Sequence, residues 1–298
     1  MFAVGAALKP LRADEGALLV PLLGKETALL AADGESVHTW NCELPCGGGA
    51  RVLPDGALLR LAQGQREPTF RSTLVRGGVC EILERDGAVR WRFSNSVTAH
   101  IASGDILALP NGHVLTTVLE WHSKSEAEGK GRDPDLLNDR GFYTPGVMEI
   151  EIIGKDRGRV VWQWSMWDHL FQKRHPSLPN YSFPGDLKGS FNIQLLAKKL
   201  GPNWLAPVSL DYEPELDLVA LGLDGIAWPI LIDHSTTSEE AATVAGGNRG
   251  RGGAALIDPD LDGDSDGAQH AARALRWARR GNELELHWLE TSQDRCWL

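Results

Sequence analysis

Short runs of alternating hydrophobic and polar residues recur along the chain and are separated by turn-forming residues. Two of them, GGVCEILE at 77–84 and GVMEIEII at 146–153, share the order Gly-Val-x-Glu-Ile. Alternation with a period of two places one set of side chains on each face of a strand. These runs therefore predict half-buried β-strands.

A proline-containing turn precedes another set of strand-like runs. LPDGALLRL at 53–61 is echoed by LPNGHVLTT at 109–117 and, more loosely, by EPELDLVAL at 213–221. The prolines of the first two copies, Pro54 and Pro110, lie 56 residues apart. Asp-Gly and Asn-Gly supply the positive φ that tight hairpins need. The spacing predicts a repeated unit of four short strands with loops of variable length.

A second phrase begins with a turn and ends in tryptophan. DGESVHTW at 33–40 is echoed by DGAVRWRF at 86–93 and DRGRVVWQW at 156–164. We expect the large, flat side chains of Trp40, Trp91, Trp162 and Trp164 to pack between neighbouring repeats, because aromatic rings dominate such contacts.

Repeated meanders cannot bury both faces alone, so the copies must stack face to face. The sequence therefore predicts an all-β fold, a β-propeller, in a single domain of residues 1–298 with few short helices. The expected helices are 238–243 and 269–280. Residues 254–298 diverge from the repeat and are expected to form an acidic loop, the second of these helices and a last strand at 282–289.

Composition and charge narrow the function classes. The chain has 298 residues, is 42% hydrophobic and carries a net charge of −10. This balance excludes general nucleic-acid binding through phosphate neutralisation. No stretch of 18 apolar residues and no convincing secretory signal are present, so we expect no membrane span and a cytoplasmic location.

Several phrases resemble the aryl-sulfate sulfotransferase family of six-bladed propellers. They are DGESVHTW, ALPNGHVL, EWHSKSEAEGKGRDPDLL, VVWQWSMWDHLFQ, SLDYEPELD and LIDHSTTSEEAATVAGGNRGRGG, in collinear order between residues 26 and 253. The resemblance implies transfer of a sulfuryl group between phenols through a sulfated histidine, without the nucleotide donor PAPS. It also implies two further histidines and an arginine that bind the sulfuryl oxygens.

The positions that match this implied site are largely substituted. Ser103-Gly104-Asp105 stands where the family has His-His-Asp, Ala206 replaces a ligand histidine, and Asp224 replaces the arginine. A carboxylate at a sulfate-binding position opposes an anionic substrate. His270, in Gln-His-Ala, is the one candidate nucleophile that survives, with an exposed helix-cap histidine as the alternative.

Other histidines are weaker catalytic candidates. His100 lies near the substituted His-His-Asp phrase, although its spacing does not match. His169 follows Asp168 beside two tryptophans, where an Asp-His pair could serve as an acid or base. For His169 and for His234, which follows Asp233, we favour a hydrogen-bonded structural role.

An acidic run resembles the calcium loop of EF-hand-like modules. Its carboxylates are Asp258, Asp260, Asp262, Asp264 and Asp266. Oxygens at alternate positions followed by glycine can wrap a hard cation, so Ca²⁺ is the candidate metal. The closing position is Gln269 rather than glutamate, which predicts weak binding; the alternative is a solvated acidic loop.

Two functions follow. The first is an arylsulfotransferase-like propeller with a degenerate site and weak or absent catalysis. The second is a non-catalytic propeller scaffold that binds a ligand or a protein partner and is stabilised by calcium. A small aromatic or sulfated molecule is the expected ligand, no nucleic acid is expected, and an open ring would favour a protein partner or a homo-oligomer. No cofactor is expected besides the candidate Ca²⁺.

Overall fold

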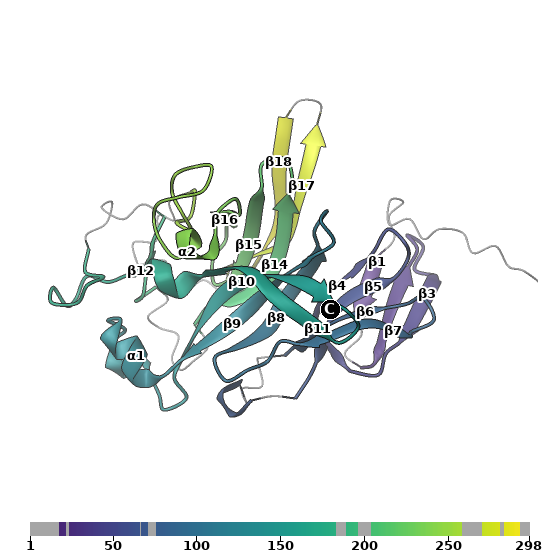
Figure 1. Ribbon diagram of the computed structural model, residues 1–298, viewed down its shortest axis with the longest axis horizontal. Coiled ribbons are helices and arrows are strands. Elements are labelled where there is room, and N and C mark those ends of the chain that lie inside the picture. Colours follow the sequence, from purple (N-terminus) through teal and green to yellow (C-terminus); the bar gives the residue numbers. More distant parts are fainter. Residues whose placement is uncertain are drawn as a thin grey trace, which may run out of the picture.

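The computed structural model describes residues 18–21, 24–65, 67–70, 76–182, 189–195, 204–257, 270–280 and 283–292. The described chain is mostly β-sheet, as predicted, and its α-helices are short: α1 (Lys124–Gly129) and α2 (Ser238–Ala241) (Figure 1). Helix α2 confirms the helix expected near residue 238. Within the described residues, no helix has the length and apolar character needed to span a membrane.

The N-terminal half forms two sheets. The first contains β1 (Leu18–Pro21), β2 (Glu26–Leu30) and β3 (Ser36–Asn41), in that order. The second has eight strands: β4 (Cys46–Val52), β5 (Leu58–Gln63), β6 (Gly78–Leu83), β7 (Val89–Ser94), β8 (His100–Ala108), β9 (Val114–His122), β10 (Phe142–Ile153) and β11 (Arg157–Ser165). It consists of two antiparallel meanders, β4 to β7 and β8 to β11, which join through β4 and β8.

The C-terminal half forms a five-stranded sheet. Its strands are β14 (Ala206–Glu213), β15 (Leu218–Asp224), β16 (Ile230–Asp233), β17 (His270–Arg280) and β18 (Glu283–Ser292). A small parallel pair, β12 (Leu170–Phe171) with β13 (Phe191–Asn192), connects the two halves. Strand β15 pairs with β14, β16 and β17, so it is the centre of this sheet.

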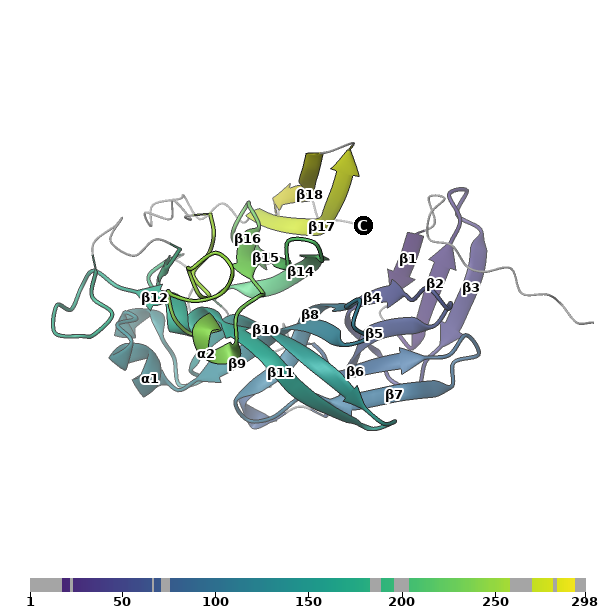
Figure 2. The same cartoon turned by 45° about the horizontal axis from the view of Figure 1, so that its top comes forward.

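The strands β4, β8, β14 and β17 lie side by side along the middle of the molecule (Figure 2). Glycines allow their backbones to approach closely. A Cβ on Gly48 would lie 2.6 Å from the carbonyl oxygen of Gly104, and a Cβ on Gly104 would lie 2.5 Å from that of Pro207. Gly104 also has a φ of 103°, which favours glycine. These four strands are called the inner strands below.

Asp105 joins three of the inner strands. Its carboxylate accepts hydrogen bonds from Arg51 on β4 at 2.7 Å and from the backbone N–H of Leu210 on β14 at 3.0 Å. The backbone N–H of Ile106 donates to the other carboxylate oxygen. Asp105 is only 6% exposed, so these contacts compensate the loss of water around its charge. The aspartate of the substituted phrase is therefore a structural clamp.

Tryptophan side chains fill the spaces between successive sheets, as the sequence predicts. Trp40 packs with Leu58 and Leu83 between the first sheet and the β4–β7 meander. Trp91 packs in a core shared by both meanders. Trp162 and Trp164 pack against the C-terminal sheet in the largest core of the described residues. All four are at most 4% exposed, so each lies within an apolar contact between neighbouring units.

The helix predicted at 269–280 is wrong, because residues 270–280 form strand β17. Alanine, arginine and leucine favour helices, but the pairing of β17 with β18 overrides that propensity. The Gly281-Asn282 dipeptide at the start of the strand expected at 282–289 is the hairpin signal that the prediction missed. The last strand expected at 282–289 is confirmed as β18.

Replacement of Gly104 by alanine tests the close approach of the inner strands. Gly104→Ala combines positive-φ strain with overlap of the Pro207 carbonyl, whereas Gly112→Ala carries the φ strain alone, since nothing lies within 4 Å of its Cβ. We expect Gly104→Ala to lower the free energy of unfolding by about 3 kcal/mol or more, and Gly112→Ala by about 1 kcal/mol. Urea denaturation measures both values, and equal losses would contradict a close-packing role.

Candidate functional site

The structure brings the positions of the implied sulfate site together. Strand register places Ala206 opposite Asp224, and Asp224 opposite Ala271, which follows His270. Gly104 lies against the backbone of the neighbouring Pro207. Gly104 lies in the middle of β8, and Ala206 and Ala271 lie at the N-terminal ends of β14 and β17. Asp224 brings a carboxylate to this end, and the side chain of His270 lies outside the described part.

The other two catalytic candidates are held in structural hydrogen bonds. His169 is 2% exposed, its Nε2 lies 2.8 Å from the Ala241 carbonyl oxygen, and its ring stacks on Trp164. The Nε2 of His100 lies 2.8 Å from the amide oxygen of Asn95. Burial lowers the pKa of both histidines, which favours the neutral ring.

His234 belongs to a polar network that ties the C-terminal sheet to the β8–β11 meander. Its Nδ1 lies 2.7 Å from a carboxylate oxygen of Asp217, and its Nε2 lies 3.0 Å from one of Glu149. His113 contacts the other oxygen of Glu149 at 2.6 Å. Burial alone would raise the pKa of Glu149, but the contacts of its carboxylate with His234, Asn111 and His113 lower it to about 2. The structural role favoured for His234 agrees with this network.

The calcium candidates lie outside the described residues, namely Asp258, Asp260, Asp262, Asp264 and Asp266. Within the described ranges, no group of three or more His, Cys, Asp or Glu side chains is arranged to hold a metal ion.

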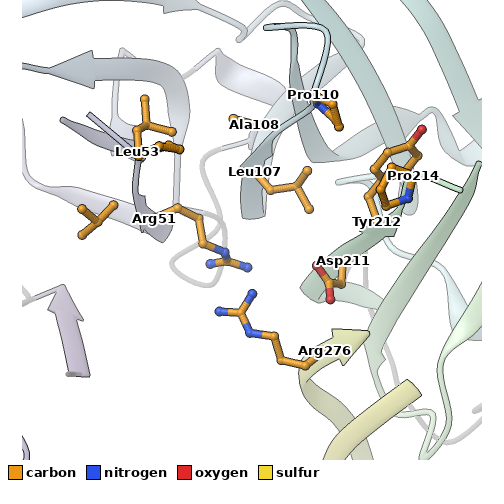
Figure 3. A pocket seen from close by; sticks show the side chains of 11 residues that line it. Arg51, Leu53, Leu107, Ala108, Pro110, Asp211, Tyr212, Pro214 and Arg276 are labelled. Atoms are coloured by element: carbon orange, nitrogen blue, oxygen red, sulfur yellow. The ribbon is translucent and has the colours of Figure 1, made fainter. Parts of the chain in front are cut away.

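A cavity of about 330 Å³ lies between the C-terminal parts of β4, β8 and β14 and the middle of β17 (Figure 3). Apolar side chains form much of its wall: Val52, Leu53, Pro54, Leu107, Pro110 and Pro214. Three charged side chains also line it: Arg51, Arg276 and Asp211. Mostly apolar walls with a few convergent polar groups are typical of small-molecule sites.

Two guanidinium groups face each other across this cavity (Figure 3). The charge of Arg51 is paired with Asp105, whereas Arg276 makes no ion pair within the described part of the chain. Arg276 follows a β-bulge between Arg273 and Arg276, in which Ala274 has a φ of 52°. Bulges re-aim side chains, and strained non-glycine residues concentrate at functional sites.

Asp211 lies beside the two guanidinium groups (Figure 3). Its carboxylate accepts a 2.7 Å hydrogen bond from the backbone N–H of Trp277, which fixes β17 to β14. Burial raises the pKa of Asp211, and that hydrogen bond and the charges of Arg276 and Arg51 oppose the rise. The cavity therefore presents positive and negative groups together within an apolar wall.

The sequence predictions did not include this cavity site. Arg276 falls within the helix expected at 269–280, and Arg51 and Asp211 lie on two other strands with no motif that connects them. A correct prediction of strand β17 would have been needed to find Arg276. In the strand, the bulge and the pairing with β18 set the direction of its side chain.

A second group of titratable side chains surrounds Glu120. Burial raises its pKa to about 7, although the Ser165 hydroxyl donates to its carboxylate. His122 lies 2.9 Å from the Thr144 hydroxyl and stacks on Trp167 with ring centroids 3.7 Å apart. These groups contact one another, so the cluster is interpreted as internal packing of polar side chains.

Comparison with known proteins assigns no family. No protein-family model and no curated protein matches the chain. Among solved structures, the chain is similar to a protein of unknown function from Bacteroides caccae, with a TM-score of 0.40 and 10% identity over 93% of this chain and 73% of that one. This similarity is too low to support an argument about fold or function.

Glu120 predicts a pH-dependent stability. Because burial raises its folded pKa from the ordinary glutamate value of 4.5 to about 7, its ionisation opposes folding, and stability falls as pH rises from about 4.5 to about 7. Glu120→Gln removes this charge. We expect it to have a small effect at pH 5 and to increase the free energy of unfolding, relative to wild type, by on the order of 2 kcal/mol at pH 9.

Urea denaturation at pH 5, 7 and 9 measures the effect of Glu120→Gln. The exposed Glu35→Gln is the control, for which we expect the same difference from wild type at every pH. A difference for Glu120→Gln that does not change with pH would contradict a raised pKa.

Proposed function

We propose that this protein is a non-catalytic ligand-binding protein built as an incomplete β-propeller, and that its ligand is a small organic anion. Support for the propeller comes from the two consecutive four-stranded meanders and the side-by-side inner strands. In a propeller, each meander is a blade and its first strand lies nearest the central axis. Strands β4, β8 and β14 are the first strands of their units here.

The observation that carries the ligand class is the pair of facing guanidinium groups of Arg51 and Arg276 (Figure 3). Asp105 offsets the charge of Arg51, so Arg276 is the cation with which an anionic group in this space would pair. Guanidinium groups also bind carboxylate and sulfate oxygens in a bidentate manner. The apolar wall provided by Leu53, Leu107 and Pro110 fits an aromatic or aliphatic body on the same ligand.

The lining residues argue for binding rather than group transfer. Covalent sulfuryl transfer requires a nucleophile held in line with the transferred group. Among the described residues, the cavity wall contains no serine, cysteine, histidine or lysine, and the hydroxyl of Tyr212 in that wall donates to Asp217 at 2.8 Å. At the other end of β14, Ala206 replaces the histidine that the sulfotransferase resemblance implies, and Asp224, which lies opposite Ala206 on β15, replaces the arginine. A ligand-binding role by descent from such an enzyme is therefore the favoured interpretation.

Arg276→Gln tests the proposed anion site. We expect wild-type protein to bind 3-phenylpropanoate, and we expect Arg276→Gln to weaken the affinity about tenfold or more, since a charge-assisted hydrogen bond contributes about 1.5–3 kcal/mol. Isothermal titration calorimetry gives both dissociation constants. Arg280→Gln is the matched control, because Arg280 lies exposed on the same strand and outside the cavity wall.

We expect Arg280→Gln to bind as wild type does. Equal affinity of wild type and Arg276→Gln, or no binding of 3-phenylpropanoate by wild type, would contradict the proposal. Both arginine variants keep the Arg51 to Asp105 ion pair, so a loss of binding would not reflect loss of that clamp.

A transfer assay separates binding from catalysis. Incubation of wild type and His270→Ala with an aryl sulfate and a phenol acceptor, followed by measurement of the released phenol, reports sulfuryl transfer. We expect no difference between the two proteins and no release above the rate without protein. Transfer that depends on His270 would overturn the non-catalytic assignment.

A further inference from the structure

The charged side chains that line the cavity indicate a narrower class of ligand than a small organic anion. Arg51 and Asp105 neutralise each other through their 2.7 Å ion pair. Asp105 also accepts hydrogen bonds from two backbone N–H groups. This pair therefore contributes little net charge to a ligand, and the charges left to define the cavity are those of Arg276 and Asp211.

Arg276 and Asp211 are close enough to interact electrostatically, yet no ion pair joins them within the described part of the chain. The Asp211 carboxylate is oriented by the Trp277 N–H, which uses one of its oxygens. A carboxylate has more acceptor sites than one donor fills. A cation and a partly buried carboxylate thus border the same space without satisfying each other.

We propose that the ligand is a small zwitterion that carries a carboxylate next to an ammonium group on an apolar body. The carboxylate contacts Arg276 and the face of Arg51, and the ammonium group donates to Asp211. The apolar body lies against Leu53, Leu107 and Pro110. This inference rests on the proposed anion-binding function and makes Asp211 a specificity-determining residue.

Desolvation provides the energetic reason for this selectivity. A carboxylate that has lost water is costly unless a donor or a cation compensates it. A plain carboxylate ligand would add a second negative charge beside Asp211, whereas a ligand ammonium group would place a cation and further donors beside it. Discrimination is strong when a site built to pair with a donor meets an analogue that lacks the donor.

Three ligands with the same aromatic body test the inference on wild-type protein: phenylalanine, 3-phenylpropanoate and 2-phenylethylamine. We expect phenylalanine to bind about fivefold or more tighter than 3-phenylpropanoate, and both to bind tighter than the amine. Equal or weaker binding of phenylalanine than of 3-phenylpropanoate would overturn the zwitterion inference and leave the anion site intact. No binding of either carboxylate would overturn the proposed function itself.

The Asp211→Asn variant tests whether Asp211 causes the preference for phenylalanine over 3-phenylpropanoate. The asparagine oxygen can still accept the Trp277 N–H, so β17 keeps its anchor on β14. We expect the preference for phenylalanine over 3-phenylpropanoate to fall to about twofold or less, mainly because 3-phenylpropanoate binds more tightly. An unchanged preference in a folded Asp211→Asn protein would exclude Asp211 as the ammonium partner, and the three-ligand comparison decides the inference even if this variant does not fold.

Discussion

The close approach of the inner strands is the constraint on which the rest of the structure depends. Backbone meets backbone at Gly48 and Gly104, where no side chain would fit. Hydrogen bonds that the Asp105 carboxylate accepts from β4 and β14 then hold the strands at this separation. Because the strands cannot move apart or slide, the residues that follow on each of them converge on one cavity.

Turn chemistry and alternation made much of the fold predictable. Asp-Gly and Asn-Gly turns followed by alternating strands are local signals, and the LPDG and LPNG phrases each form the turn before a strand of the structure. Strand β17 could not be predicted from such local signals, because its alanines and arginines favour a helix and its conformation depends on pairing with β18. Pairing between strands outweighs local propensity there.

The candidate site was less predictable for a physical reason. Arg51, Asp211 and Arg276 lie on three strands far apart in the sequence, so no fixed spacing relates them. The phrases that resemble the sulfotransferase family predicted a site at the N-terminal ends of β14 and β17 instead. The strand register does bring Ala206, Asp224 and Ala271 together there. The resemblance therefore identified positions that are adjacent in space. The charged side chains that can bind a ligand lie farther along β14 and β17, at Asp211 and Arg276.

The tryptophans that separate successive sheets have a consequence for how the molecule unfolds. Trp40, Trp91 and the Trp162–Trp164 pair each occupy the interface of one unit with the next. Stability in such a stack is close to a sum of unit and nearest-neighbour terms, as in repeat proteins. Loss of the first sheet would then expose a single interface, the core that contains Trp40 and Leu58. The arrangement favours unfolding by stages that begin at the ends of the row.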